Sequence, residues 1–347
     1  VVVDHADGIA FASRFATACR LPPAASDDAV LAALQPFAGP SSALVATGDP
    51  WVRFVMRRRA ELDAAFGRVL HPANAALDIC LDKQRFADWC DAQRLPAPRA
   101  WLAGVQARPA DLRMPLLVRP ARTLHGLAHH GLPKAQEVAD EPALTALLAR
   151  FAAAGMPALV SESLLAQSPV QYSVPFARRR GTTLSFVARK LRPAPARCSV
   201  GTCVELWPQP QVEAVARAAV EALDYEGVGE VEILHAQASD RLALIEINAR
   251  PWLQYALAPA SGHDFLGLLL DRPPAARAPR KSGRRWIDLE SDLFGALSSS
   301  VGAVRHGELG ALAYLRSLLG VNVFARFDWR DPAPAWHRPR AAAGTRR

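Results

Sequence analysis

The sequence lacks the long apolar run that a membrane-spanning helix requires. Such a helix needs about 20 consecutive apolar residues, and no uninterrupted stretch of about 18 occurs in the 347 residues. The amino terminus, VVVDHADGIAFASRF, has an early Asp4 and no basic segment, which is unlike a secretory signal peptide. We therefore expect no membrane span and a cytoplasmic location.

Cysteine is scarce, and its spacing excludes the usual structural uses of this residue. The cysteines are odd in number and scattered, with no CxxC pair and no spacing typical of a zinc site. A reducing cytoplasm therefore fits the chain best. The five residues are Cys19, Cys80, Cys90, Cys198 and Cys203.

The chain also lacks a basic domain, although its formal net charge is +8. Residues 272–285 carry six positive charges and no acid, and residues 337–347 carry four arginines and no acid. The rest of the chain is close to −2, so the positive excess belongs to a Pro-rich linker and a tail. No aromatic residues interleave with these charges as they do in RNA-binding motifs. We expect no nucleic-acid partner.

The hydrophobic content of 50% allows two or three domains with proper cores. In the first 80 residues, SALVATGDP (42–50) predicts a strand that ends in a turn, and residues 51–66 predict the helix that follows. This βα unit is typical of a doubly wound sheet. A Rossmann-type oxidoreductase would need GxGxxG after its first strand, and HADGIAFASRF does not supply that motif.

The remainder of the chain alternates predicted strands and helices, which indicates an α/β fold. Predicted helices occupy the segment after Leu81, where Pro96 and Pro98 end the helix, and residues 140–155, 209–227 and 284–319. The predicted strands are 115–120, 157–165, 171–177, 183–192, 198–207, 228–236 and 241–249.

The stretch ALIEINARPW (243–252) places polar residues inside an apolar run. Side chains alternate between the two faces of a strand, so Glu246, Asn248 and Arg250 should share one face. Ile245, Ile247 and Ala249 should then line the other face. A buried charge is costly unless it is paired or bound to a metal, so the polar face needs partners. A solvent-exposed face of a hairpin is the plainer alternative.

The neighbouring predicted strand strengthens the functional interpretation. The two strands flank the turn-prone QASD, and a hairpin centred near Ser239 sets Glu232 opposite Glu246. Facing carboxylates repel each other unless a cation lies between them. A divalent metal is the obvious candidate.

These motifs, taken in order, resemble the ATP-grasp superfamily, in its carboxylate-amine ligase-like branch. The resemblance covers nearly the whole chain, and it rests on SRFATACRLP, ATGDP, LDKQRF, PLLVRP, LVSESLL, ARKLRPAP, GEVEILH, IEINARPW, RRWIDLESDL and DPAPAW. It implies a Rossmann-like domain over 1–80 and an ATP-grasp domain over 81–270. The subdomains of the latter, about 81–160 and 161–270, would clasp ATP. Residues 271–347 would form the linker, a helical extension and the Arg-rich tail.

The resemblance also implies a reaction. A carboxylate attacks the γ-phosphate of ATP to give an acyl phosphate and ADP, and an amine, or another nucleophile such as a thiol, then displaces phosphate. Small-molecule carboxylates and amines would be the partners, and the sequence leaves the oligomeric state open. Glu232, Glu246 and Asn248 would hold Mg²⁺ or Mn²⁺, with Glu230 as a further possible ligand. The expected catalytic residues are Arg250, Lys190 and Arg192.

The same resemblance assigns the nucleotide site. Lys83 and Arg119 would contact the phosphates, with Arg119 standing where the family usually has lysine. Glu162, with the backbone of Ser163 and Leu165, would receive the adenine. Gln171 would contact the ribose in place of the usual acid.

One segment departs from the family pattern. The loop 121–131, ARTLHGLAHHG, keeps only Gly126 and Gly131 where a glycine-rich lid normally covers the phosphates. His125, His129 and His130 lie in this loop without further ligands. An ATP-binding regulatory or scaffold protein that has lost turnover is therefore the alternative to a ligase.

Overall fold

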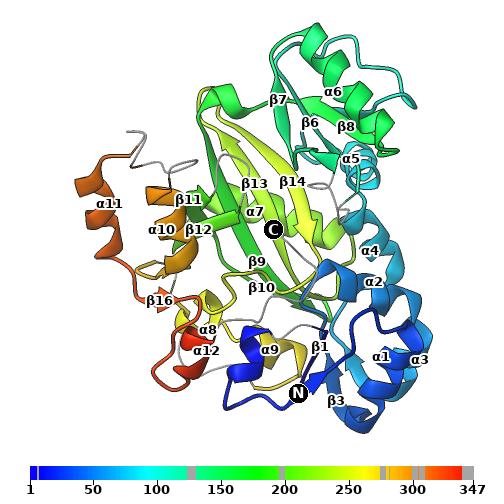
Figure 1. Ribbon diagram of the computed structural model, residues 1–347, viewed down its shortest axis with the longest axis vertical. Helices are drawn as coiled ribbons and strands as arrows, with labels where there is room; N and C mark the ends of the chain where they lie inside the picture. Colours follow the sequence, from blue (N-terminus) through cyan, green and yellow to red (C-terminus); the bar gives the residue numbers. More distant parts are fainter. Residues whose placement is uncertain are drawn as a thin grey trace.

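The computed structural model describes residues 1–5, 8–122, 130–194, 200–273, 279–280, 282–298, 304 and 309–337. They form an N-terminal part, a small four-stranded sheet and a large sheet (Figure 1). The small sheet, at the top of the view, and the N-terminal part, in blue at the bottom, lie on the same side of the large sheet. The predicted mixed α/β fold is confirmed.

The N-terminal part contains two parallel strand pairs in place of one continuous sheet. Its strands are β1 (Val2–Asp4), β2 (Ala18–Arg20), β3 (Gly39–Leu44) and β4 (Phe66–Val69). Its helices are α1 (Asp27–Leu34), α2 (Asp49–Arg57), α3 (Arg59–Ala65) and α4 (Asn74–Leu81). Helix α2 begins after Gly48 with Pro50 in its first turn, as the sequence ATGDP predicts.

The small sheet is antiparallel, with the order β5-β8-β6-β7. Its elements are α5 (Lys83–Ala92), β5 (Ala100–Leu102), β6 (Leu116–Pro120), β7 (Gln136–Val138), α6 (Glu141–Ala153) and β8 (Ala158–Glu162). Helix α6 is capped by Asp140 and buries Leu144, Leu147 and Phe151 against the sheet, so the amphipathic pattern predicted this helix correctly.

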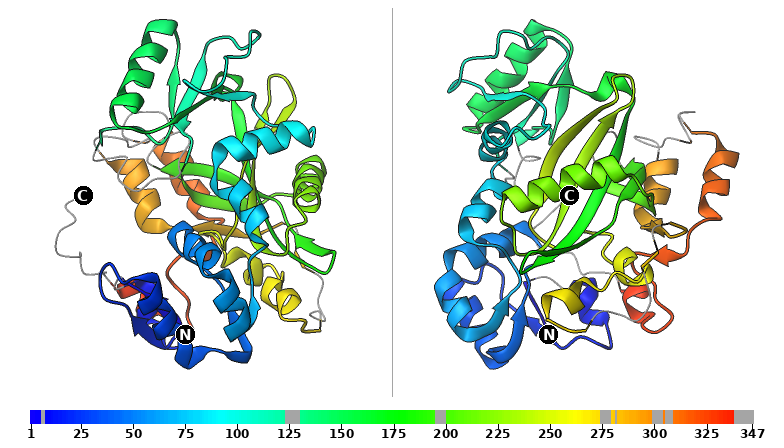
Figure 2. Two further views of the ribbon diagram at one scale, coloured as in Figure 1. Left: turned by 90° about the vertical axis from the view of Figure 1, so that its right-hand side faces the viewer. Right: turned by 180° about the vertical axis from the view of Figure 1, so that it is seen from behind.

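The large sheet has the strand order β14-β13-β9-β11-β12-β15-β16, and β10 pairs with β9. Its strands from the middle of the chain are β9 (Pro169–Arg179), β10 (Thr182–Ser185), β11 (Ala188–Ala194), β12 (Val200–Leu206), β13 (Gly227–Ala236) and β14 (Arg241–Asn248). Helix α7 (Pro210–Ala222) lies across one face, where Val212 and Ala216 join Val231 and Ile233 in the core (Figure 2). The opposite face remains available for a site.

The hairpin of β13 and β14 has the predicted register, with Glu232 opposite Glu246. One part of the prediction was wrong. A β-bulge leaves Ile245 unpaired, and its side chain lines a cleft instead of joining Ile247 in the core. The Leu244 amide, beside the bulge, donates to the Pro96 carbonyl at 2.6 Å. The bulge shifts the alternation by one residue, so Leu244 and Glu246 face opposite sides although both have even numbers.

The C-terminal segment completes the large sheet. The predicted helix over 284–319 was wrong at its start, because β15 (Arg285–Ile287) pairs with β12 and buries Trp286 fully. The large sheet therefore includes strands from beyond residue 270. The remaining elements are α8 (Leu257–Ala260), α9 (Phe265–Leu269), α10 (Leu289–Leu297), α11 (Ala311–Leu318), β16 (Val323–Phe324) and α12 (Ala333–Trp336).

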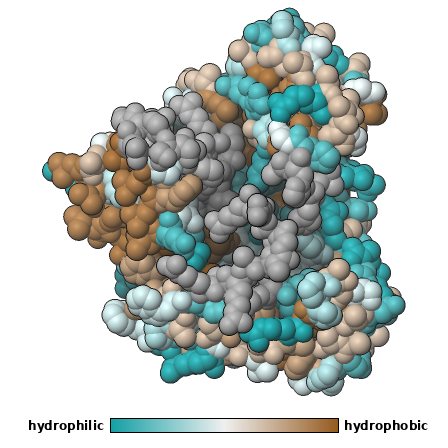
Figure 3. Space-filling model, in the orientation of Figure 1, coloured by the Kyte–Doolittle hydropathy of each residue, from teal (hydrophilic) through white to brown (hydrophobic). Residues whose placement is uncertain are grey.

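The outer surfaces of α10 and α11 are apolar, as the brown region at the left of Figure 3 shows. Leu293 and Phe294 on α10 and Leu312 and Leu315 on α11 are all exposed. No helix among the residues that the structure describes is long and apolar enough to cross a bilayer.

His71 joins the N-terminal part to the end of β14. The Ala46 amide donates to its Nε2 at 2.7 Å, and its Nδ1 lies 3.1 Å from the Ala249 carbonyl oxygen. Because Nε2 accepts, Nδ1 carries the proton and the ring is neutral. Burial lowers the pKa of His71 to about 4.

We expect His71 to make the protein less stable in mild acid. The unfolded chain binds a proton at His71 near pH 6.5 and the folded chain only near pH 4, so stability falls as the pH drops between these values. The shift corresponds to about 3 kcal/mol. Urea unfolding of the wild type and of His71→Asn at several pH values measures this contribution. Parallel pH profiles for the two proteins would contradict it.

Candidate functional site

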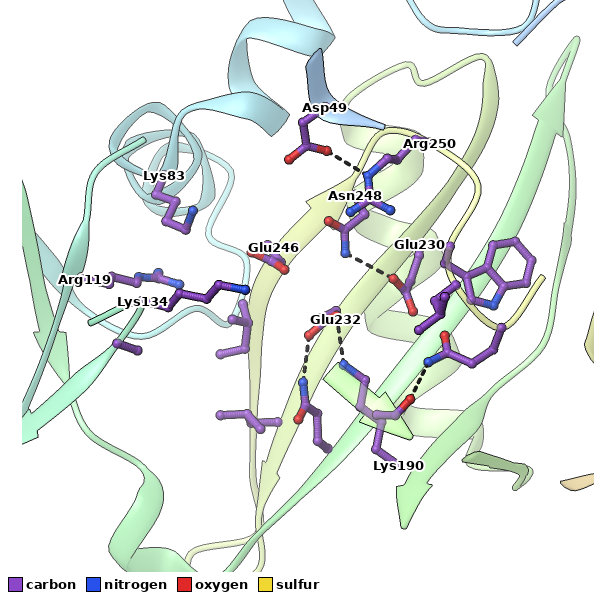
Figure 4. A pocket seen from close by; sticks show the side chains of 18 of the residues that line it. Asp49, Lys83, Arg119, Lys134, Lys190, Glu230, Glu232, Glu246, Asn248 and Arg250 are labelled. Atoms are coloured by element: carbon purple, nitrogen blue, oxygen red, sulfur yellow. Dashed lines mark hydrogen bonds and ion pairs between the residues drawn. The ribbon is translucent and has the colours of Figure 1, made fainter. Parts of the chain in front are cut away.

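A large cleft lies where the N-terminal part, the small sheet and the large sheet meet, and it has a volume of about 2140 Å³. The free face of the large sheet forms one wall, and Figure 4 shows the polar side chains that reach into it. Strands β9, β11, β13 and β14 supply Gln171, Lys190, Glu230, Glu232, Glu246 and Asn248 to this wall.

Glu232 lies at the centre of the polar wall. Lys190 Nζ lies 2.9 Å from one of its carboxylate oxygens, and Gln171 Nε2 donates to the other at 2.7 Å. Burial alone would lower the pKa of Lys190, but the nearby carboxylates, Glu232 first, raise it above its usual value. Lys190 therefore stays charged next to Glu232.

Glu246 faces Glu232 across the hairpin and is partly buried. Burial, followed by the charge of Glu232, raises the pKa of Glu246, although Lys83 and Arg119 act in the opposite direction. The like charges predicted from the sequence thus lie together on one wall. A divalent cation would lower the cost of holding both of them ionised.

Glu230 is the innermost of the three carboxylates. It accepts hydrogen bonds from the Ser173 hydroxyl and, at 3.1 Å, from Asn248 Nδ2. Burial and the nearby Glu232 raise the pKa of Glu230 to about 7. Because Asn248 uses its amide nitrogen to reach Glu230, its oxygen is left to face the cleft. The hydrogen bond to Glu230 therefore orients the Asn248 side chain.

Cations gather on the side of the cleft opposite the carboxylates. Lys83 begins α5, Arg119 comes from β6, and Lys134 precedes β7 (Figure 4). Asp82 caps α5 by accepting from the Gln84 amide at 3.0 Å, which fixes the start of the helix. Burial lowers the pKa of Lys83, while Glu246 opposes that shift. This wall suits an anionic ligand such as a polyphosphate.

Lys134 was missed by the sequence reasoning. It lines the cleft beside Arg119, and it makes no ion pair with any residue that the structure describes. No local motif distinguishes it, because its position depends on how β6 and β7 pair.

Arg250 lies at the end of the cleft next to the N-terminal part. Its Nε donates to Asp49 Oδ1 at 2.7 Å, and Nη1 donates to the Pro251 carbonyl at 3.3 Å (Figure 4). Asp49 is the first residue of α2, so this ion pair joins two parts of the molecule. Asp49 was also missed. It is 201 residues from Arg250 in the sequence, and only the fold brings the two side chains together.

The segment expected to receive adenine is only partly directed at the cleft. Glu162 and Leu165 line it, but Ser163 does not. The Ser163 amide donates to the Pro115 carbonyl at 3.3 Å, and the Leu165 amide to the Ser163 hydroxyl at 3.3 Å. Arg241 binds both carboxylate oxygens of Glu162, at 2.6 and 2.8 Å, and this pairing lowers the pKa of Glu162 despite burial. Gln171, which was expected to contact the ribose, donates a hydrogen bond to Glu232.

Arg192 is not brought into the cleft. Its guanidinium makes two hydrogen bonds to Asp292 on α10, at 2.8 and 2.9 Å, and another to the Ser317 hydroxyl at 2.6 Å. The register of β11 is irregular on both sides of Arg192. Arg192 and Lys190 therefore need not share a face, as residues two apart do in a regular strand. The structure thus places Arg192 in a contact between the sheet and the C-terminal helices.

The loop that departs from the family pattern lies mostly outside the described residues. His125, Gly126 and His129 lie outside the described residues, whereas His130 and Gly131 are described. Gly131 has a φ of +60°, which suits a turn before β7. Within the described ranges, no group of three or more His, Cys, Asp or Glu side chains is arranged to hold a metal.

Comparisons with known proteins give structural matches alone, since no family model and no curated protein sequence matches the chain. The structure is similar to a biotin carboxylase from Campylobacter jejuni in a β,γ-ATP complex, with a TM-score of 0.61 and 17% identity over 80% of this chain. It is also similar to an N5-carboxyaminoimidazole ribonucleotide synthetase in an ADP complex, with a TM-score of 0.61 and 15% identity over 80% of this chain. This chain covers 66% of the first protein and 72% of the second.

An L-amino acid ligase from Bacillus licheniformis is similar as well, with a TM-score of 0.55 and 14% identity over 73% of this chain and 61% of that one. The chain thus spans slightly less than two thirds of the biotin carboxylase and of this ligase. These similar structures are ATP-grasp enzymes, so the fold expected from the sequence is confirmed.

Proposed function

We propose that this chain, whose fold is that of the ATP-grasp carboxylate-amine ligases, uses ATP to join a carboxylate to an amine and releases ADP and phosphate. One observation carries the proposal: a wall of clustered carboxylates and an amide faces a wall of cations across one cleft. That arrangement suits a nucleotide polyphosphate bound together with divalent metal.

The residues of the carboxylate wall fit Mg²⁺ or Mn²⁺. Glu232 and Glu246 face each other on paired strands, and the orientation of Asn248 leaves its amide oxygen toward the cleft. Hard oxygen donors of this kind, completed by phosphate oxygens, are what Mg²⁺ prefers. We propose these three residues as the ligands. When bound, the metal would neutralise phosphate charge and help to orient the transferred phosphoryl group.

The cationic side chains would bind and orient the nucleotide. Lys83, Arg119 and Lys134 would hold the phosphates, and Glu162 and Leu165 lie at the part of the cleft proposed for adenine. A substrate carboxylate oxygen then attacks the γ-phosphorus, the bond to ADP breaks, and an acyl phosphate remains. Lys190 and Arg250 would stabilise the charge that develops on the phosphoryl group and on the acyl phosphate.

A substrate-dependent assay tests this proposal. The purified protein is incubated with ATP, Mg²⁺ and mixtures of candidate carboxylates and amines, and ADP and phosphate are measured. We expect release that requires both substrates, stops when EDTA removes the metal, and returns when Mg²⁺ or Mn²⁺ is added.

Calorimetry with ATP separates this proposal from the alternative function. ATP binding without substrate-dependent release would favour a regulatory or scaffold protein. Absence of ATP binding would contradict both functions.

A further inference from the structure

Arg250 lies outside the regular part of the large sheet. Strand β14 ends at Asn248, and beyond that point Arg250 pairs with no strand that the structure describes. His71 Nδ1 donates to the Ala249 carbonyl at 3.1 Å, so the backbone next to Arg250 is tied to the N-terminal part. An arginine side chain has several rotatable bonds, and this backbone contact does not determine them. The side chain therefore needs a contact of its own to keep one orientation.

Asp49 supplies that contact from the first turn of α2. Its Oδ1 accepts from Arg250 Nε at 2.7 Å, and the Pro251 carbonyl accepts from Nη1 at 3.3 Å. Arg250 makes no further hydrogen bond to any residue that the structure describes. A guanidinium carries five N–H donors, so one donor on Nη1 and both donors on Nη2 are left for a ligand.

The contact determines which end of the guanidinium a ligand can reach. Both residues line the cleft, and Figure 4 shows Asp49 directed at Arg250. A guanidinium binds a phosphate best through two N–H groups at once. Asp49 occupies Nε, so only the end that carries Nη1 and Nη2 can bind a phosphate in this way.

The ion pair is not explained by stability alone. The side chains of Asp49 and Arg250 are each 27% exposed. An ion pair that water can reach contributes little to the stability of a fold. A role in the cleft accounts better for a contact that joins the N-terminal part to the end of β14.

We propose that Asp49 is a positioning residue for phosphoryl transfer: it holds Arg250 by Nε, so that the Nη end of the guanidinium faces the transferred group. The inference rests on the proposed ligase function and adds a residue of the N-terminal part to its chemistry. In this role Asp49 touches neither ATP nor the acyl phosphate, and it acts only through Arg250.

The Asp49 carboxylate also acts on Lys83. Burial lowers the pKa of Lys83, and the charges of Glu246 and Asp49 are among those that oppose this shift. Loss of the Asp49 charge therefore also affects a side chain that would contact the phosphates. Asp49→Asn removes the charge and keeps an acceptor oxygen, whereas Asp49→Ala removes both. Comparison of the two variants separates the effect of charge from that of positioning.

Steady-state ADP release at saturating substrates measures the role of Asp49. Asp49→Ala should lower kcat about 30-fold or more, because a misplaced Arg250 no longer meets the charge that develops in the transition state. Affinity for a non-hydrolysable ATP analogue with Mg²⁺ should stay within about threefold. Asp49→Asn should lower kcat less than about fivefold, since the acceptor remains. Equal losses in the two variants would assign the effect to charge and overturn the inference.

Asp63→Ala is the matched control. Asp63 accepts from Arg59 Nε at 2.8 Å in a similar ion pair of the N-terminal part, and neither residue lines the cleft. This change should leave kcat within about twofold of the wild type. A loss as large as that of Asp49→Ala would show that such pairs act through the fold, and it would overturn the inference.

A double-mutant cycle tests whether Asp49 acts through Arg250. Arg250→Met alone should lower kcat about 100-fold. In that background Asp49→Ala should change kcat by less than about twofold, because the side chain that it positions is absent. A full further loss would show that Asp49 acts by another route and would overturn the inference.

NMR of the arginine Nε–H groups reports the contact without turnover. The Arg250 signal is identified by its absence in Arg250→Met. It should be observed in the wild type and in Asp49→Asn, and it should be lost to solvent exchange in Asp49→Ala. An unchanged signal in Asp49→Ala would overturn the inference.

The outcomes separate this inference from the proposed function. Wild-type turnover that Asp49→Ala retains would overturn the inference and leave the ligase standing. If the wild type binds ATP but releases no ADP with any substrate pair, the proposed function fails. The positioning role then fails with it, even where the NMR signal confirms the contact.

Discussion

Glu246→Gln should reduce substrate-dependent ADP release by about 10³-fold or more. The change keeps the size of the side chain and removes the charge that we propose binds Mg²⁺ opposite Glu232. Asn248→Ala should have an effect of the same order, because it removes the third proposed oxygen ligand. Steady-state assays at saturating Mg²⁺ measure both losses, and far-UV circular dichroism verifies the fold.

Glu221→Gln is the matched control for this experiment. Glu221 is exposed on α7, which covers the face of the large sheet away from the cleft. Turnover by the Glu221→Gln variant should therefore remain within about twofold of the wild type. Unchanged turnover in both Glu246→Gln and Asn248→Ala would refute the metal assignment.

Lys190→Met should destabilise the metal-free protein by about 3–5 kcal/mol. The side chains of Lys190 and Glu232 are only 6% and 14% exposed, so removal of the ammonium leaves Glu232 buried beside two further carboxylates. Urea denaturation in the presence of EDTA measures the loss. Mg²⁺ with a non-hydrolysable ATP analogue should restore part of the lost stability, because added cations replace the missing positive charge.

Lys134→Met provides the comparison for stability. Lys134 also lines the cleft but forms no ion pair within the described residues, so its replacement should change the free energy of unfolding by less than about 0.5 kcal/mol. Equal effects of the two lysine substitutions would show that the ion pair with Glu232 does not stabilise the fold.

The sequence predicted those features that depend on local pattern. The turn-prone QASD located the hairpin, and counting from it placed Glu232 opposite Glu246. Amphipathic spacing with a capping Asp140 located α6. In these cases the residues that determine the structure are neighbours along the chain or across one turn.

Features that depend on tertiary contacts were missed. The bulge at Ile245 breaks the alternation from which its position was predicted, and β15 is a strand that pairs with both β12 and β16. Asp49 and Lys134 reach the cleft from separate parts of the fold. Alternation and propensity contain no information on which distant segment will be adjacent.

The bulge in β14 lies where the large sheet contacts the segment that leads into the small sheet. Leu244 beside it binds the Pro96 carbonyl, and Arg241 on the same strand binds the Ala97 carbonyl at 3.2 Å and the carboxylate of Glu162. Through Glu162, the last residue of β8, these contacts link the β14 edge of the large sheet to the small-sheet part. Arg119 and Lys134 belong to the small-sheet part, while the proposed metal ligands belong to the large sheet. Contacts at the bulge therefore help to set the distance across the cleft between the cations and the carboxylates.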